Sequence, residues 1–299
     1  MFINIAFIAI AIIALFNPQL DPVFWNDNQM SLGDINFRRL KLLTYEPSYY
    51  SLLLAPIAFY YLIKIALKKI DQPVLYFVLL LSPMILSLSF GVILGMILAF
   101  ALLVVMNAKE VLLRKTNLRF LIPGIVLVCS GLAILWVFFP NNIFFLRITN
   151  TLSGKDLSFN GRTFDSFILG IRIACEKSFW WGTGLGQVKL IGLDFFKKFY
   201  HYDNFTVDDI GIPNNVADIL ATFGMVGVII KLCAEIYFYR ITRVATNYYR
   251  QSLFLFVFIY QFTGSYIMNI AEYAIWVIAF KQNIFTEFDK PVKHQDREL

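Results

Sequence analysis

Charged side chains and histidines are scarce in this chain of 299 residues. Only 15% of its residues are charged and two are histidine, whereas 59% are hydrophobic. Soluble domains carry about 25% charged residues, so the composition argues against a soluble protein. Several apolar runs approach the roughly 20 residues needed to cross a bilayer. Because spanning backbone must satisfy its own hydrogen bonds, and the short alternating segments of a membrane barrel are not seen, we expect an all-α polytopic bundle of transmembrane helices.

The sequence also lacks the patterns of a disulfide framework or a metal site. Of its three cysteines, Cys129 lies in an apolar run, Cys233 lies beside a basic cluster, and Cys175 has no partner on its own side of the membrane. Neither CxxC nor paired Cys/His spacing indicates zinc. We therefore expect no metal and no cofactor. A basic n-region and a small-residue cleavage site are not evident at the N-terminus, so we expect no cleaved signal peptide.

The formal net charge of +6 comes from basic clusters in short segments between apolar runs, at residues 64–69, 109–119 and 231–250. These clusters alternate with segments of mixed sign, which is the positive-inside pattern of membrane proteins. The charge therefore predicts orientation, and without a basic stripe we expect no nucleic-acid partner.

The apolar runs predict about eight crossings with both termini in the cytoplasm. The expected spans are residues 1–16, 47–63, two within 73–106, 120–139, 214–230 and two within 251–280. The two paired spans should break near Ser87–Gly91 and near Gly264–Ser265, because serine and glycine relax helix geometry. The segment 17–46 and a large loop, 140–213, would share the outer side. Residues 281–299 would form a cytoplasmic tail, and the whole chain a single integral membrane domain.

The large loop carries three arginines: Arg147, Arg162 and Arg172. Cations in a protein built for hydrocarbon are costly and are usually kept for a substrate. Asn160 is the expected N-cap of an amphipathic helix that runs from residue 161 or 162 to about 178. On this helix Arg162 could pair with Asp165 and Arg172 with Glu176, so both arginines could also be ordinary surface cations.

An aromatic run and a glycine turn follow this helix. Residues 179–181 read F-W-W, and Gly182, Gly184 and Gly186 come directly after them. Tryptophan suits the headgroup level, and glycines let backbone N–H groups approach an anion. No strand precedes the glycines, so they are not a dinucleotide fingerprint. Guanidinium groups and free amides at this height suit a lipid-linked phosphate or diphosphate.

The order of these segments is distinctive. Arg162 opens a helix, E-K-S-F-W-W-G-T-G-L-G follows, and N-N-V-A-D-I-L-A-T-F-G-M-V-G opens a span at Asn214. This order resembles the signature of bacterial O-antigen polymerases (Wzy-type) and O-antigen ligases, a "P-x-x-G-x-G-x-G" turn followed by an "H-N-x-x-L-x-x-x-G-x-x-G" helix start. Ser178 stands where proline is usual, and Asn214 where the ligases have histidine.

A second resemblance lies upstream. Residues 39–48 read R-L-K-L-L-T-Y-E-P-S, similar to the "R-x-x-G-x-x-x-E-P-S" segment of polysaccharide polymerases. Residues 87–91 resemble their "S-x-S-R-G" turn, with Phe90 in place of arginine. The match covers roughly residues 38–230. Family members are usually longer, with more crossings, so we expect this chain to lack their first helices.

The resemblance implies a GT-C-type glycosyltransferase in the bacterial inner membrane, with its active site facing the periplasm. It would transfer a glycan from undecaprenyl diphosphate to a lipid-linked repeat unit without a cofactor. From the family we also expect membrane lipid and a chain-length regulator co-polymerase as partners. Arginines would stabilise the departing diphosphate, each contributing ~3 kcal/mol by analogy with oxyanion donors.

These considerations assign roles to particular residues. We expect Arg162 and Arg172 to act on the leaving group, while the acceptor hydroxyl needs a base. Glu46, at the outer start of a span, is the first candidate, although a carboxylate there is also favoured by the helix dipole. His201 is the second, although a lone loop histidine is more often incidental. The expected substrate-binding residues are Arg147, Arg39, Tyr45, Gly182, Gly184, Gly186, Asn214 and Asn215.

Other function classes stay open. Asn214 cannot abstract a proton, which favours a polymerase over an O-antigen ligase-type transferase. A flippase for lipid-linked oligosaccharides usually carries polar residues inside paired spans. Here the nearest such residues are Glu235 and Glu272, and the other polar residues gather in one loop. A truncated, inactive relative is the third alternative.

Overall fold

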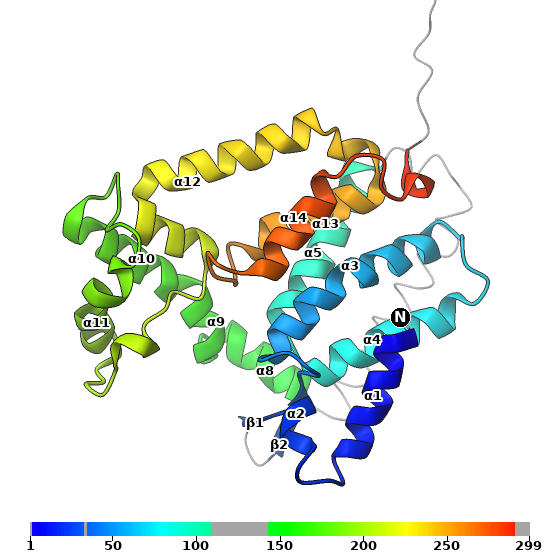
Figure 1. The fold of residues 1–299 in the computed structure, drawn as a ribbon, viewed down its shortest axis with the longest axis horizontal. Coiled ribbons are helices and arrows are strands. Elements are labelled where there is room, and N and C mark those ends of the chain that lie inside the picture. The colour runs from blue at the N-terminus through cyan, green and yellow to red at the C-terminus, as the bar shows by residue number, and fades with distance from the viewer. Residues whose placement is uncertain (1, 33–34, 109–142, 291–299) are drawn as a thin grey trace, which may run out of the picture.

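A computed structural model describes residues 2–32, 35–108 and 143–290 (Figure 1). The described chain is mostly helical, in agreement with the expected all-α class. The predicted span 120–139 and the basic cluster 109–119 lie outside the described residues.

Among the residues that the structure describes, two helices are long and apolar enough to cross a membrane, α3 (Pro47–Ala66) and α12 (Asn215–Ile241). Shorter apolar helices accompany them: α1 (Phe2–Ala14), α4 (Pro73–Ser87), α5 (Phe90–Met106) and α14 (Ile270–Phe280). A bundle of about eight crossings therefore stays a prediction.

Both predicted breaks in the paired apolar runs are confirmed. Between α4 and α5, Leu88 adopts a left-handed conformation with φ 44°, so the helix ends and restarts at Phe90. A loop that contains Gly264 and Ser265 separates α13 (Tyr248–Tyr260) from α14.

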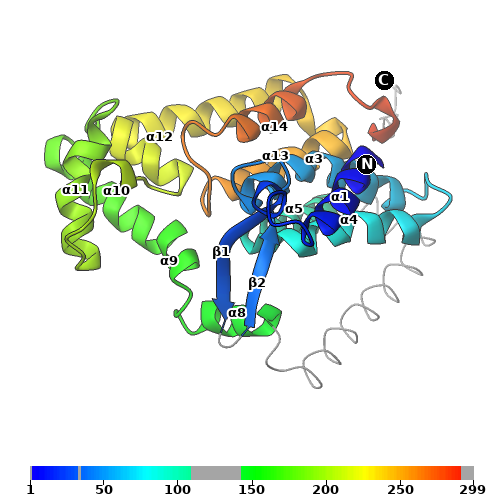
Figure 2. The same cartoon turned by 60° about the horizontal axis from the view of Figure 1, so that its bottom comes forward.

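The segment before α3 is not the simple polar connection that we expected. It forms α2 (Asp21–Phe24) and an antiparallel hairpin of β1 (Trp25–Leu32) and β2 (Ile35–Leu40). Buried Trp25 anchors it, because its indole N–H donates to the Ala11 carbonyl at 2.7 Å. Figure 2 shows the hairpin extending from the helices toward α8.

The described part of the large loop is itself helical, and its later helices lie beside the first half of α12 (Figure 1). It forms α8 (Ile143–Leu152), α9 (Leu157–Arg162), α10 (Phe164–Lys177) and α11 (Gln187–Tyr200). Leu169 and Ile173 of α10 and Val188 of α11 pack with Ala217 and Ala221 of α12 in one buried cluster.

The predicted helix start at Asn160 is wrong. Asp156 caps α9 instead, by accepting a hydrogen bond from the Phe159 amide at 3.0 Å, and Asn160 lies inside α9. Thr163, with φ −112° and ψ −92°, then breaks the helix, and α10 begins at Phe164. As a result Arg162 ends one helix rather than opening another.

A second buried cluster joins α3, α5, α13 and α14. Its largest fully buried side chains include Phe59 of α3, Phe256 of α13 and Ile275 of α14. The absence of a side chain at Gly95 in α5 lets the Phe256 ring approach, since a Cβ there would lie 3.3 Å from it. This packing fixes the starts of α3 and α14 beside the end of α13, where the candidate site lies.

Candidate functional site

Arg162 and Glu46 meet although 116 residues separate them. The Arg162 Nη2 donates to Glu46 Oε1 at 3.2 Å, and the two side chains are 30% and 33% exposed. Glu46 precedes Pro47 at the start of α3, and Arg162 ends α9. The packing of α3 against the rest of the bundle thus brings together the first candidate base and the first candidate cation.

A small pocket surrounds this ion pair. Its lining residues are Tyr45, Glu46, Ser48, Tyr49, Leu52, Arg162, Pro213, Tyr260, Ser265, Tyr266 and Asn269. They come from the start of α3, the end of α9, the residue before the cap of α12, the end of α13 and the loop between α13 and α14. The Tyr45 and Tyr49 rings lie 4.9 Å apart between centroids, and Tyr45 is exposed. Aromatic faces beside hydroxyl and amide groups suit a sugar ring, which has apolar faces and polar edges.

The surroundings of the pocket favour the charged form of Arg162. Burial opposes the charged form of Arg162, but Tyr260 and Glu46 outweigh it, and the net effect raises the pKa of this guanidinium. Although much of Tyr45 is exposed, partial desolvation of its phenol, with the neighbouring Glu46 carboxylate, raises the pKa of Tyr45. Burial also raises the pKa of Tyr266, although Arg162 opposes this shift. The phenols therefore stay protonated at neutral pH, as hydrogen-bond donors near the arginine.

Asn214 holds the backbone of Arg162 in place. Its side chain is fully buried; Oδ1 accepts from the Ala217 amide at 3.0 Å and so caps α12. Its Nδ2 donates to the carbonyls of Arg162 at 2.9 Å and Phe262 at 2.6 Å. These contacts turn the amide toward the protein and give Asn214 a positioning role, while its expected binding role stays a prediction.

Asn215 belongs to a different, buried polar cluster. It donates to Glu272 Oε1 at 2.8 Å and accepts from Lys231 Nζ at 3.1 Å. Asn215 therefore does not line the Arg162 pocket, and its expected binding role stays a prediction. Lys231, which we assigned to a cytoplasmic cluster, lies well inside α12, since this helix continues to Ile241.

The glycine turn serves the close approach of two backbone segments. The amide of Gly182 donates to Ser178 at 2.7 Å, and that of Gly184 to the Thr222 carbonyl at 2.9 Å. The expectation of free amides at Gly182 and Gly184 is therefore wrong. Gly186 has φ 75° and stands at the N-cap of α11, outside the Arg162 pocket.

The partner of this turn is a kink in α12. At Gly224 the backbone leaves helical geometry, with φ 67° and ψ −167°. The amides of Met225 and Val226 donate to the carbonyls of Phe179 and Trp180 at 3.0 and 3.1 Å. The motif thus joins the loop helices to the membrane-length helix that carries Asn214.

Arg39, Arg172 and His201 do not line the pocket. Arg172 is on the exposed face of α10, with its guanidinium 5.7 Å from the centre of the Phe199 ring. His201 is exposed at the end of α11, which does not favour it as the base. Arg147 lies within α8. Arg39 of β2 donates through Nε to the Ser87 carbonyl at 3.0 Å, which joins the two upstream segments of the resemblance.

Comparisons of the chain with protein-family models, with curated proteins and with solved structures find no match. The functional assignment therefore rests on the residues of this site.

Sequence reasoning missed several pocket residues, among them Tyr260, Tyr266 and Asn269. The available signal was topological. The turn at Gly264–Ser265 was predicted on the same outer side as Glu46 and the large loop, so polar residues beside it were candidates for the same site.

Proposed function

We propose that the chain is a glycosyltransferase of the O-antigen polymerase type. It extends a polysaccharide at the periplasmic face of the bacterial inner membrane by transferring a glycan from undecaprenyl diphosphate to a lipid-linked repeat unit. The observation that carries this proposal is the partly buried Arg162–Glu46 pair in a tyrosine-lined pocket. The two membrane-length helices that begin beside this pocket support an outer-face location.

In the protein without substrate, the Glu46 carboxylate is paired with the Arg162 guanidinium, to which an anionic substrate would also bind. A diphosphate offers the same kind of oxygen acceptors as a carboxylate, with more negative charge, so it competes for Arg162. Binding of the substrate would release Glu46 beside the pocket. The released carboxylate can then accept a proton from the acceptor hydroxyl.

The reaction balances without a cofactor. The acceptor oxygen forms a bond to the anomeric carbon of the donor glycan, and the bond from that carbon to the diphosphate oxygen breaks. The electron pair leaves with undecaprenyl diphosphate, where Arg162 stabilises the developing charge. The hydroxyl proton passes to Glu46. The Tyr45 and Tyr49 rings would hold the sugar during this exchange.

A polymer-length assay in cells tests the proposal. In a polymerase-deficient strain, Arg162→Ala and Glu46→Gln should support only single repeat units, while the wild type restores long chains. Arg172→Ala is the matched control, because Arg172 is an arginine of the same loop that lies outside the pocket. Long chains from the Arg162→Ala variant at normal protein level would refute the proposal.

A transporter of lipid-linked oligosaccharides is the second candidate, and one observation favours it. Lys231, Glu235 and Glu272 lie together among α12, α13 and α14, and charged residues inside a helical membrane bundle often mark a transport path. A transport assay in the same polymerase-deficient strain separates the two. A transporter would move the lipid-linked unit across the membrane without lengthening the glycan.

A further inference from the structure

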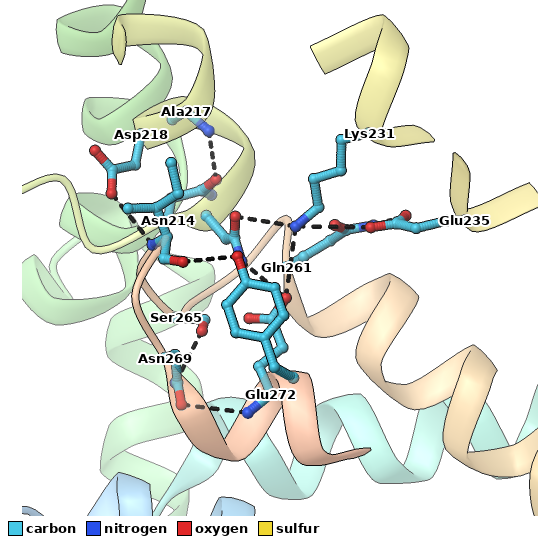
Figure 3. Close-up of polar contacts among 12 residues, drawn as sticks. Asn214, Ala217, Asp218, Lys231, Glu235, Gln261, Ser265, Asn269 and Glu272 are labelled. Atoms are coloured by element: carbon cyan, nitrogen blue, oxygen red, sulfur yellow. Dashed lines mark hydrogen bonds and ion pairs between the residues drawn. The ribbon is translucent and has the colours of Figure 1, made fainter. Parts of the chain in front are cut away.

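A cluster of buried charges lies apart from the Arg162–Glu46 pair. Lys231 Nζ is 3.6 Å from Glu235 Oε1 and 3.6 Å from Glu272 Oε1, and it donates to Asn215 Oδ1 at 3.1 Å. Gln261 of the loop after α13 donates to Glu235 Oε2 at 2.9 Å. Figure 3 shows Lys231, Glu235, Gln261 and Glu272 gathered between their helices. We call these four residues and Asn215 the Lys231 cluster.

The charges of the Lys231 cluster do not balance. One ammonium group faces two carboxylates, and the three side chains are only 16%, 8% and 0% exposed. A net negative charge at such a place has a desolvation cost of several kcal/mol. Buried ionisable groups usually avoid this cost by taking up or releasing a proton.

The cluster also has too few hydrogen-bond donors. Among the described residues of the cluster, two buried side-chain oxygens have no donor, Glu272 Oε2 and Gln261 Oε1. Both atoms are acceptors, so the cluster needs a donor or a cation. One added proton supplies a donor and removes the excess charge at once.

A metal ion fits the cluster less well than a proton. The ammonium group of Lys231 would repel a second cation nearby. Hard cations also take about six oxygen ligands, and the described cluster offers only two oxygens without a donor. In the described parts of the chain, no group of three or more His, Cys, Asp or Glu side chains could hold a metal ion.

The other titratable groups around the cluster do not supply the missing charge. Tyr260 of α13 and Tyr273 of α14 are within electrostatic range of Glu272, and both are neutral when protonated. Asp218 of α12 lies within range of Tyr273 and accepts a hydrogen bond from the Ile267 amide at 3.2 Å. It can only add negative charge.

We propose that the Lys231 cluster is a proton-binding site that holds one proton on the carboxyl groups of Glu235 and Glu272. Lys231 and Glu235 line a cavity of about 600 Å³ along α12 and α14, which provides a route for proton exchange. Two adjacent asparagines join this site to the Arg162 pocket. Asn215 contacts Glu272, and Asn214 holds the Arg162 carbonyl.

Infrared spectroscopy of the purified full-length protein in lipid nanodiscs tests this proposal. A protonated carboxyl group gives a carbonyl band that shifts in D₂O, and we expect this band at pH 7. Glu272→Gln and Glu235→Gln each leave one ammonium and one carboxylate, so either change should abolish the cluster's band. Lys231→Met leaves two carboxylates without a cation, so the band should about double.

Glu287→Gln is the matched control, because Glu287 is paired with Lys64 at 3.2 Å and is 40% exposed. It should leave the band unchanged, and comparing each variant with the wild type cancels any contribution from Asp218. Circular dichroism shows whether each variant is folded. Lack of a protonated carboxyl band in the wild type, its persistence in both glutamine variants, or its loss on adding sodium ions would overturn the proposal.

Discussion

The substitution Gly182→Ala tests whether the glycine turn exists for close backbone packing. Gly182 has φ 69°, and a Cβ there would lie 2.5 Å from both the Gly224 nitrogen and the Thr222 oxygen. These are backbone atoms of the α12 kink, so they cannot move aside as a flexible side chain would. Gly186→Ala is the matched control, since it has φ 75° and no atom within 4 Å of its added Cβ.

We expect Gly182→Ala to destabilise the protein more than Gly186→Ala. Both substitutions place an alanine in left-handed backbone, which costs roughly 1–2 kcal/mol. Only Gly182→Ala adds overpacking, which costs roughly 1–3 kcal/mol more and also separates the loop from α12. We therefore expect Gly182→Ala to lower the melting temperature of the detergent-purified protein clearly more than Gly186→Ala does. Equal losses in the two variants would refute the packing role of Gly182.

Three further predictions concern the hydrogen bonds of Asn214, Tyr200 and Asp209. Asn214→Ala removes the cap of α12 and should cost at least about 0.5–2 kcal/mol of unfolding free energy. Asn214→Asp keeps the cap oxygen but turns a second, buried oxygen toward the carbonyls of Arg162 and Phe262, so it should not restore the stability. A melting temperature of either variant equal to that of the wild type would contradict the positioning role. Burial and Asp165 raise the pKa of Tyr200 to about 12, so its contribution to stability is complete below pH 10 and is lost as the pH rises toward 12. In melting curves recorded as a function of pH, Tyr200→Phe should remove this loss of stability at alkaline pH. An unchanged dependence on pH would contradict the role of Tyr200. Asp209, whose pKa is lowered by hydrogen bonds from Thr206, adds stability at neutral pH that disappears in acid, and Asp209→Asn should abolish this difference.

Local signals in the sequence predicted the helical class and the positions of two helix breaks. Serine and glycine at Ser87–Gly91 and Gly264–Ser265 identify breaks because they act on neighbouring backbone. The hairpin was missed because its first strand reads W-N-D-N-Q-M-S-L, and Asn and Asp are depleted in strands. Its stability comes instead from Trp25, which contacts α1.

The sequence predicted individual residues of the site but not that they lie together. Arg162, Glu46 and Tyr45 were identified individually, but the Arg162–Glu46 contact depends on how α3 packs against α13 and on where α9 ends. Lys231 was misplaced because its charge resembles the basic residues that follow α12. Its true environment is set by Glu272 of α14, which local patterns cannot reveal.

Binding of a short-chain polyprenyl diphosphate to the purified protein tests the central claim most directly. Arg162→Ala should weaken binding about 10-fold or more, as expected for loss of a charge-assisted hydrogen bond. Glu46→Gln should bind at least as tightly as the wild type, because the competing carboxylate is gone, while Arg172→Ala should match the wild type. Unchanged affinity in Arg162→Ala, or weaker binding in Glu46→Gln, would contradict the account.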